Sequence, residues 1–182
     1  MKEKVTKNVY SYPEGFEPNH IVPSEYSPYR FALGRKGETP LIVICMNPSA
    51  AQDRLSDKTI NRIINISRKL NMDGWMVFNL YPERATDSSK MGDFKQDISN
   101  ENIQEMKNYL IEHKIKEVWG AWGDDNNIDA LIKGKAQMKS MFLEIGVKVY
   151  YYGTLTKMGN PRHPLQRHEK WDFSKKEYLN LE

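Results

Sequence analysis

The chain has 182 residues, with 27 Lys or Arg against 24 Asp or Glu and a formal net charge of +3. Its length suits one folded domain, and 39% hydrophobic with 28% charged residues is typical of a soluble globular protein. A single cysteine excludes a disulfide framework and a four-cysteine metal site within one chain. No apolar run approaches the roughly 20 residues of a membrane helix, and the charged start is unlike a secretory signal. We therefore expect a cytoplasmic protein that uses no metal and no other cofactor.

The first part of the chain, residues 1–40, is rich in Tyr and has Pro at positions 13, 18, 23 and 28. Proline restricts both itself and the residue before it to extended conformations. We therefore predict an extended arm over residues 1–40 that wraps the domain and ends in an edge hairpin around residues 29–33. The single α/β domain is placed at residues 41–182.

Continuous apolar runs typical of strands buried on both faces occur four times: Leu41–Met46, Trp75–Leu80, Glu117–Gly123 and Val147–Tyr152. Amphipathic segments between them predict three helices: at residues 58–70, at about 100–113, and around 128–142 with an interruption near Gly134. Strands that alternate with helices indicate a parallel sheet. The predicted fold is an α/β three-layer sandwich with a central, mainly parallel four-stranded sheet.

Parallel strands end at one edge of their sheet, and ligands bind at that edge in open α/β folds. Asn47 follows the first apolar run, where Pro48 holds the turn stiff. Asn79 ends the second run, Trp122 lies at the end of the third, and the loop around His163 follows the fourth. We therefore predict a site at this edge.

The residues at this edge suit recognition and hydrolysis rather than metal chemistry. The amide of Asn47 can hold a water or a substrate group, although it could also form an Asx-turn that only ends the strand. Asn79 can offer a donor and an acceptor to the edge of a base. His163 lies between two prolines, and a histidine on a stiff loop can donate to an oxygen that gains charge. The alternative for His163 is an ordinary surface histidine.

Other features carry no chemistry in this interpretation. No phosphate-binding loop, dinucleotide fingerprint or serine elbow is present. Ser56 or Asp57 is the expected N-cap of the first helix, and Asp124 and Asp125 are expected to cap the third helix rather than to bind a metal. Cys45 lies inside an apolar run and is expected to be an inert core residue.

Positive charge is concentrated near the end of the chain. Residues 148–182 contain seven Lys or Arg against four Asp or Glu. This segment is either a solvated tail or an edge that faces phosphates, in which case Lys157, Arg162 and Arg167 would contact nucleic acid. The connection over residues 81–97 is longer than the usual ~4–6 residues, which favours a functional or mobile loop.

Several motifs resemble a small bacterial and phage family of unknown function. In chain order they are Tyr29-Arg30-Phe31-Ala32-Leu33, Met46-Asn47-Pro48-Ser49, Asp57-Lys58-Thr59, Asn79-Leu80, Arg84-Ala85-Thr86-Asp87, Trp122-Gly123 and Gly159-Asn160-Pro161-Arg162-His163-Pro164. The resemblance extends over about residues 30–165 and implies no settled activity.

A more distant resemblance is to the mismatch-specific and single-strand-selective uracil-DNA glycosylases. The apolar run that leads into Met46-Asn47-Pro48 is similar to their first motif, and His163-Pro164 looks like their His-Pro-Ser motif. The segment of residues 118–123 resembles the strand before their last helix. Cys45 and Ser49 stand where that motif usually has Gly, and Leu165 stands where the later motif has Ser.

This resemblance implies a uracil-DNA-glycosylase-like fold and gives each residue a role. Asn47 would position the attacking water, Asn79 would read the base, and His163 would stabilise the departing base. The remaining substrate-binding residues would be Pro48, Ser49, Arg84, Trp122, Arg162 and Pro164.

We favour a glycosylase-like enzyme that hydrolyses the N-glycosidic bond of a nucleobase in DNA. A non-catalytic protein that binds a nucleotide or a modified nucleoside would use the same pocket without the water. A phage or mobile-element accessory module would use the edge to bind another protein. All three alternatives stay open on the sequence alone.

Overall fold

Seven strands form one mixed sheet in the computed structural model, which describes residues 9–166 and 171–182. The strands are β1 His20–Val22, β2 Ala32–Arg35, β3 Pro40–Cys45, β4 Gly74–Asn79, β5 Glu117–Gly120, β6 Lys148–Tyr151 and β7 Glu177–Tyr178. The helices are α1 Lys58–Lys69, α2 Gln96–Glu112 and α3 Asp129–Ile145, with a short 3₁₀ helix, η1, at Ser88–Lys90.

The sheet has a parallel core, as the sequence predicts. Its order is β1-β2-β4-β3-β5-β6-β7, and the pairs β4–β3, β3–β5 and β5–β6 are parallel. The prediction of four strands is too small, because β1 and β2 extend the sheet beside β4 and β7 extends it beside β6, all with antiparallel pairing. β2 lies between β1 and β4, so it is not at the edge of the sheet.

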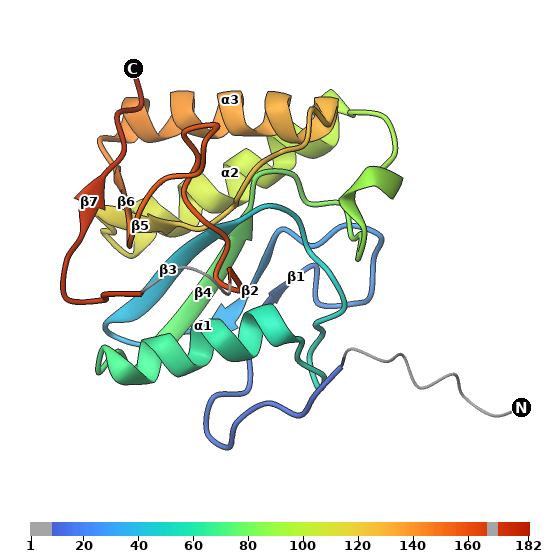
Figure 1. Cartoon of the computed structure of the whole chain (residues 1–182). Helices are drawn as coiled ribbons and strands as arrows, with labels where there is room; N and C mark the ends of the chain where they lie inside the picture. The colour runs from blue at the N-terminus through green and yellow to red at the C-terminus, as the bar shows by residue number, and fades with distance from the viewer. Residues whose placement is uncertain (1–8, 167–170) are drawn as a thin grey trace, which may run out of the picture.

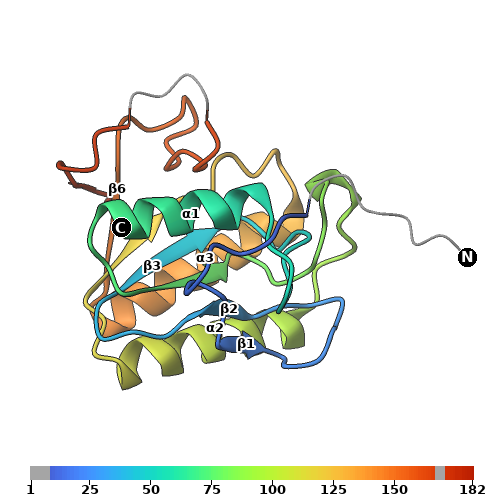
Figure 2. The same ribbon diagram turned by 90° about the horizontal axis from the view of Figure 1, so that it is seen from below.

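The three helices cover both faces of the sheet, which gives the predicted three layers. Figure 1 shows α2 and α3 on one face and α1 on the other, and Figure 2 shows α1 from its own side. One buried cluster therefore contains Met106, Leu110, Leu131 and Phe142 from α2 and α3. The cluster on the opposite face contains Ile60, Ile63 and Ile64 of α1.

Strand pairing and side-chain hydrogen bonds join the N-terminal arm to the domain. β1 and β2 lie within residues 1–40, so the sheet continues across the expected boundary at residue 40. The hydroxyl of Tyr12 donates to the carbonyl of Gln52 at 2.5 Å, and the indole N–H of Trp75 donates to the carbonyl of Phe16 at 3.0 Å. Among the described helices, none has the length and apolar character needed to span a bilayer.

Helix α1 begins at a side-chain cap, which confirms Asp57 as one of the two predicted caps. A carboxylate oxygen of Asp57 accepts from the backbone N–H of Ile60 at 2.9 Å. This cap places the carboxylate directly after the loop that follows β3. The first turn of α1 thereby joins the edge of the sheet where the site is predicted.

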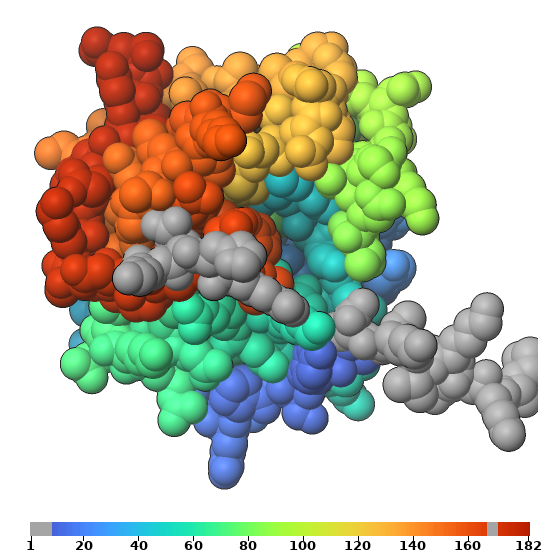
Figure 3. Space-filling view, viewed as in Figure 1, coloured from blue at the N-terminus to red at the C-terminus, as the bar shows by residue number. Residues whose placement is uncertain are grey.

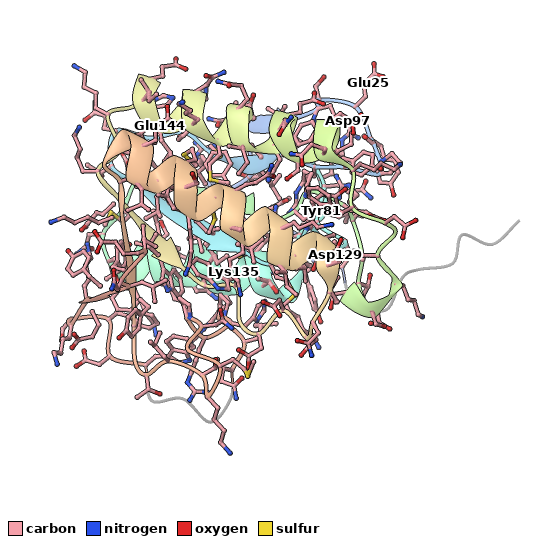
Figure 4. All side chains as sticks on the ribbon, turned by 90° about the horizontal axis from the view of Figure 1, so that it is seen from above. Glu25, Tyr81, Asp97, Asp129, Lys135 and Glu144 are labelled. Atoms are coloured by element: carbon pink, nitrogen blue, oxygen red, sulfur yellow. The ribbon has the colours of Figure 1, made fainter. Side chains whose placement is uncertain are left out.

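The predicted interruption of the third helix is wrong, since α3 continues through Gly134. A Cβ atom at Gly134 would lie 2.2 Å from the carbonyl oxygen of Leu80, so glycine is present here because the helix closely approaches the chain after β4. Figure 4 shows Tyr81 between the first turn of α2, marked by Asp97, and the first turn of α3, marked by Asp129.

Asp124 and Asp125 do not cap α3, whose N-cap, Ile128, makes no side-chain hydrogen bond. Asp124 accepts from Thr156 at 2.6 Å and from the amide of Asn160 at 2.8 Å. Asp125 accepts from Lys135 at 2.5 Å, and although burial opposes the shift, this hydrogen bond lowers the pKa of Asp125. The two carboxylates therefore tie the loop after β5 to α3 and to the loop after β6.

Candidate functional site

A cavity of about 300 Å³ lies at the carboxyl ends of β3 and β4. In the space-filling view, a hollow on this face lies between the green segment after β4 and the orange-red segment after β6 (Figure 3). The residues that line the cavity are Arg30, Cys45, Met46, Asn47, Ser49, Asp57, Thr59, Ile60, Val77, Asn79, Ala85, Thr86, Ser88, His163 and Leu165. The cavity is thus at the edge that the strand order predicts, with a volume at the lower end for small-molecule sites.

Four of the predicted site residues meet in this cavity: Asn47, Ser49, Asn79 and His163. They come from the ends of two adjacent strands and from a loop more than 80 positions further along the chain. Their convergence follows from the parallel pairing of β3 with β4 and from the path of the chain after β6.

The other predicted residues do not line the cavity, and most of their polar groups have partners in the protein. Arg84 donates to the carbonyls of Ser27 and Ala51, at 3.0 and 2.9 Å. Trp122 is fully buried and donates to Asn160 at 3.2 Å.

Arg162 and the two prolines also lie outside the cavity lining. The guanidinium of Arg162 donates to the carbonyls of Thr154 and Leu155, at 3.0 and 3.2 Å. Pro48 and Pro164 are buried. Arg167, the third predicted phosphate contact beside Lys157 and Arg162, lies outside the described residues.

The amide of Asn79 is fully buried, and neither its Nδ2 nor its Oδ1 atom has a hydrogen-bond partner among the described residues. Its backbone is well tied, because its carbonyl accepts from the Nδ2 of Asn102 at 3.0 Å and its neighbour Leu80 donates to the carbonyl of Cys45. A buried polar group without a partner costs about 1–3 kcal/mol. This side chain therefore has the features of a group that is held ready for a ligand.

Asn47 uses its amide nitrogen to tie two loops together. Its Nδ2 donates to the carbonyls of Pro48 at 2.9 Å and Ala85 at 2.8 Å, and the backbone N–H of Ala85 donates to the same Pro48 carbonyl. These contacts fix which end of the amide is nitrogen. The Oδ1 atom receives no hydrogen bond from the described residues and remains an acceptor at the cavity.

His163 is held as a neutral donor. Burial lowers the pKa of its imidazole, while the charge of Asp57 opposes the shift. Its Nδ1 accepts from the backbone N–H of Leu165 at 3.2 Å, so the proton of the neutral ring is on Nε2. The imidazole can therefore donate a hydrogen bond from Nε2 to a group in the cavity.

Two charged residues that line the cavity were not predicted as site residues from the sequence. Arg30 is only 2% exposed, and its Nη1 donates to the carbonyl of Ala51 at 2.7 Å. Its Nε has no partner within residues 9–166 and 171–182. Burial lowers the pKa of Arg30 to about 10, with the nearby charge of Arg84 acting in the same direction. Asp57 was recognised only as a cap, although it also lines the cavity. In the sequence, Arg30 could have been recognised because it is a lone charged residue directly before the apolar run of residues 31–33.

No cluster of metal-binding side chains is found among the described residues. Cys45 lines the cavity but is fully buried, and burial raises the pKa of its thiol to about 12. The thiol therefore stays protonated at neutral pH and is a poor nucleophile or metal ligand.

Mild acid is expected to destabilise the fold through His163 and His20, whose pKa values are both lowered by burial. Each contributes stability that is fully present above the unfolded pKa of about 6.5 and is lost as the pH falls through the folded pKa. Glu105 acts in the opposite direction, because burial raises its pKa. The melting temperature, measured from pH 7.5 to 5.5, should fall in the wild type and fall less in His163→Gln and His20→Gln. Equal slopes in all three proteins would contradict this assignment.

Fold and site together define an α/β protein with a cavity of mixed polar and apolar lining at the carboxyl edge of a parallel sheet core. The chain belongs to the family DUF1643, described as proteins of unknown function, whose model matches residues 30–165. The match includes both residues that form the cavity's buried charges, Arg30 and Asp57. Comparisons with curated proteins and with solved structures found no match.

Proposed function

We propose that this protein is a uracil-DNA-glycosylase-like enzyme that hydrolyses the N-glycosidic bond of a nucleobase in DNA. The observation that carries the proposal is the amide of Asn79, which is fully buried, lines the cavity and has no partner in the part of the chain that the structure describes. A primary amide presents two donors and an acceptor, which complement the edge of a pyrimidine or a purine. A base seated here would satisfy the amide and remove the cost of its burial.

The proposed reaction needs a positioned water and a stabilised leaving group. The Oδ1 atom of Asn47 would hold the water, whose oxygen bonds to the sugar carbon C1′ as the bond from C1′ to the base nitrogen breaks. The bonding electrons leave with the base, and the Nε2 proton of His163 would stabilise the negative charge by a hydrogen bond. Asp57 lines the same cavity and would accept the proton that the water loses.

A second candidate is a protein that binds a nucleotide or a modified nucleoside without cleaving it. The observation that favours it is the engagement of Asn47 with the carbonyls of Pro48 and Ala85, which gives this residue a structural role. In this case the cavity would recognise the base through Asn79, and the water would have no part.

The proposal is tested with labelled single- and double-stranded oligonucleotides that contain uracil, hypoxanthine or hydroxymethyluracil. After incubation with the protein, alkaline heating breaks the strand wherever a base has been released. Cleavage at one of these bases is the expected result. No cleavage at high protein concentration and long times would contradict the enzyme and leave the non-catalytic candidate.

Asp57→Asn is expected to lower the cleavage rate by about 10²–10⁴-fold, the usual contribution of a general base. Asparagine is as good an N-cap as aspartate, so the hydrogen bond to the N–H of Ile60 should persist, while loss of the charge near Arg30 should lower the melting temperature. The rate is measured in single-turnover assays. A rate within a factor of three of the wild type would exclude Asp57 as the proton acceptor.

A further inference from the structure

The cavity has more hydrogen-bond donors than recognition of a base requires. Its lining includes four hydroxyl side chains that make no hydrogen bond with other described residues: Ser49, Thr59, Thr86 and Ser88. The Nε of Arg30 is also buried and has no partner among the described residues. These donors are additional to the amide of Asn79 and the Nε2 of His163.

Positive charge is in excess beside the cavity, although Arg84 itself does not line it. Arg30 and Arg84 both donate to the carbonyl oxygen of Ala51, at 2.7 and 2.9 Å, so two guanidinium groups lie close together. The acidic group among the cavity-lining residues is Asp57, which accepts from the N–H groups of Ile60 at 2.9 Å and Ala51 at 3.3 Å.

No ion pair formed by the described residues includes Arg30 or Arg84. Asp57 is thus the carboxylate that acts on Arg30, which is almost completely buried and has the charge of Arg84 close by. A buried charge without a close counter-charge is costly unless a ligand neutralises it. An anionic group in the cavity would supply the missing counter-charge.

We propose that the nucleotide bound here carries its own phosphate into the cavity, against Arg30 and the hydroxyl groups. Phosphate oxygens accept charge-assisted hydrogen bonds from guanidinium groups, and serine and threonine hydroxyls can donate to them. A single nucleoside monophosphate is then a sufficient ligand, without the rest of a strand. This inference rests on the proposed function, because it assigns Asn79 and His163 to the base.

The test is isothermal titration calorimetry with the 2′-deoxynucleoside 5′-monophosphates of uracil, thymine, cytosine, adenine and guanine, each beside its nucleoside. At least one monophosphate is expected to bind ten-fold or more tightly than its nucleoside. Arg30→Met is expected to remove this difference. If no monophosphate is preferred over its nucleoside, the inference is overturned.

A milder double variant keeps the test informative if Arg30→Met does not fold. Ser49→Ala combined with Thr59→Val removes two hydroxyl donors without changing any charge, and it should weaken the monophosphate at least five-fold while leaving the nucleoside unchanged. Ser140→Ala, on the exposed side of α3, is the matched control and should change neither. Unchanged monophosphate affinity in the double variant would overturn the inference.

The oligonucleotide assay separates this inference from the proposed function. Base release from an oligonucleotide by a protein that binds no monophosphate would overturn the phosphate site and leave the glycosylase proposal intact. If no base is released and no nucleoside or nucleotide binds, both proposals fail.

Discussion

Replacing Asn79 by Leu is expected to raise the free energy of unfolding by about 1–3 kcal/mol and to abolish ligand binding in the cavity. Leucine branches at the same carbon as asparagine, and the substitution removes two buried polar atoms that have no partner among the residues the structure describes. For a chain of this size, each 1 kcal/mol corresponds to about 2–4 °C in melting temperature. Calorimetry for stability and the nucleotide titration for binding measure the two effects separately.

A matched control is available in α2, the helix that packs against this part of the sheet. Asn102 is also fully buried, but only its Oδ1 lacks a partner among the described residues, since its Nδ2 donates to the carbonyl of Asn79 at 3.0 Å. Asn102→Leu would remove one unpartnered atom and leave that carbonyl without its donor, so the two effects on the free energy of unfolding should offset each other. Two substitutions of the same chemical kind, at neighbouring buried positions, are therefore expected to differ, because Asn79→Leu stabilises the protein and Asn102→Leu does not. A destabilised Asn79→Leu that still binds nucleotide would contradict a ligand-binding role for this amide.

This difference illustrates how a binding residue can be recognised in the folded protein. The Nδ2 of Asn102 is satisfied by a backbone carbonyl, and Asn102 is not among the residues that line the cavity. A side chain retained for a ligand leaves part of its hydrogen-bonding capacity unused at a cavity. Asn79 and the Nε of Arg30 both show this pattern, and both line the same cavity.

The parallel core could be predicted because its strands are continuous apolar runs separated by amphipathic helices. The strand ends then determine where Asn47 and Asn79 lie, since Cys45 pairs with Asn79 across β3 and β4. The strands β1 and β7 are three and two residues long, too short for an alternating pattern. Their pairing is determined by the tertiary path of the chain, which no local pattern encodes.

The candidate site could be predicted only in part, for a related reason. A strand end places a side chain at the edge, but neighbouring groups decide whether that side chain faces the cavity or braces the loops. Arg84 and Arg162 are both basic loop residues, and their guanidinium groups donate to backbone carbonyls. Arg30 precedes an apolar strand, and its burial depends on the approach of the loop that contains Ala51, more than 20 positions away in the sequence.

Gly134 shows that a glycine required for close packing can look, in the sequence, like a break in the helix. In isolation, glycine weakens a helix by about 1 kcal/mol relative to alanine, which is why the sequence pattern predicts an interruption. In the structure, α3 runs through this position because the absent side chain lets the helix backbone approach the carbonyl oxygen of Leu80. Leu80 directly follows Asn79, so this contact also positions the end of β4 at the cavity.

Gly134→Ala is therefore expected to lower the free energy of unfolding by about 2 kcal/mol, although helix propensity alone would raise it by about 1 kcal/mol. The added Cβ would lie 2.2 Å from a backbone oxygen, and backbone cannot move aside as a flexible side chain can. Urea denaturation measures the change, and Ala136→Gly, at an exposed position of the same helix, measures the propensity term by itself. A stabilised Gly134→Ala would mean that α3 and the end of β4 are less closely packed than the structure indicates. Leu80 must shift to admit the methyl group, so nucleotide affinity should fall in Gly134→Ala. It should stay unchanged in Ala136→Gly. This pair of results would link the packing of α3 to the geometry of the cavity.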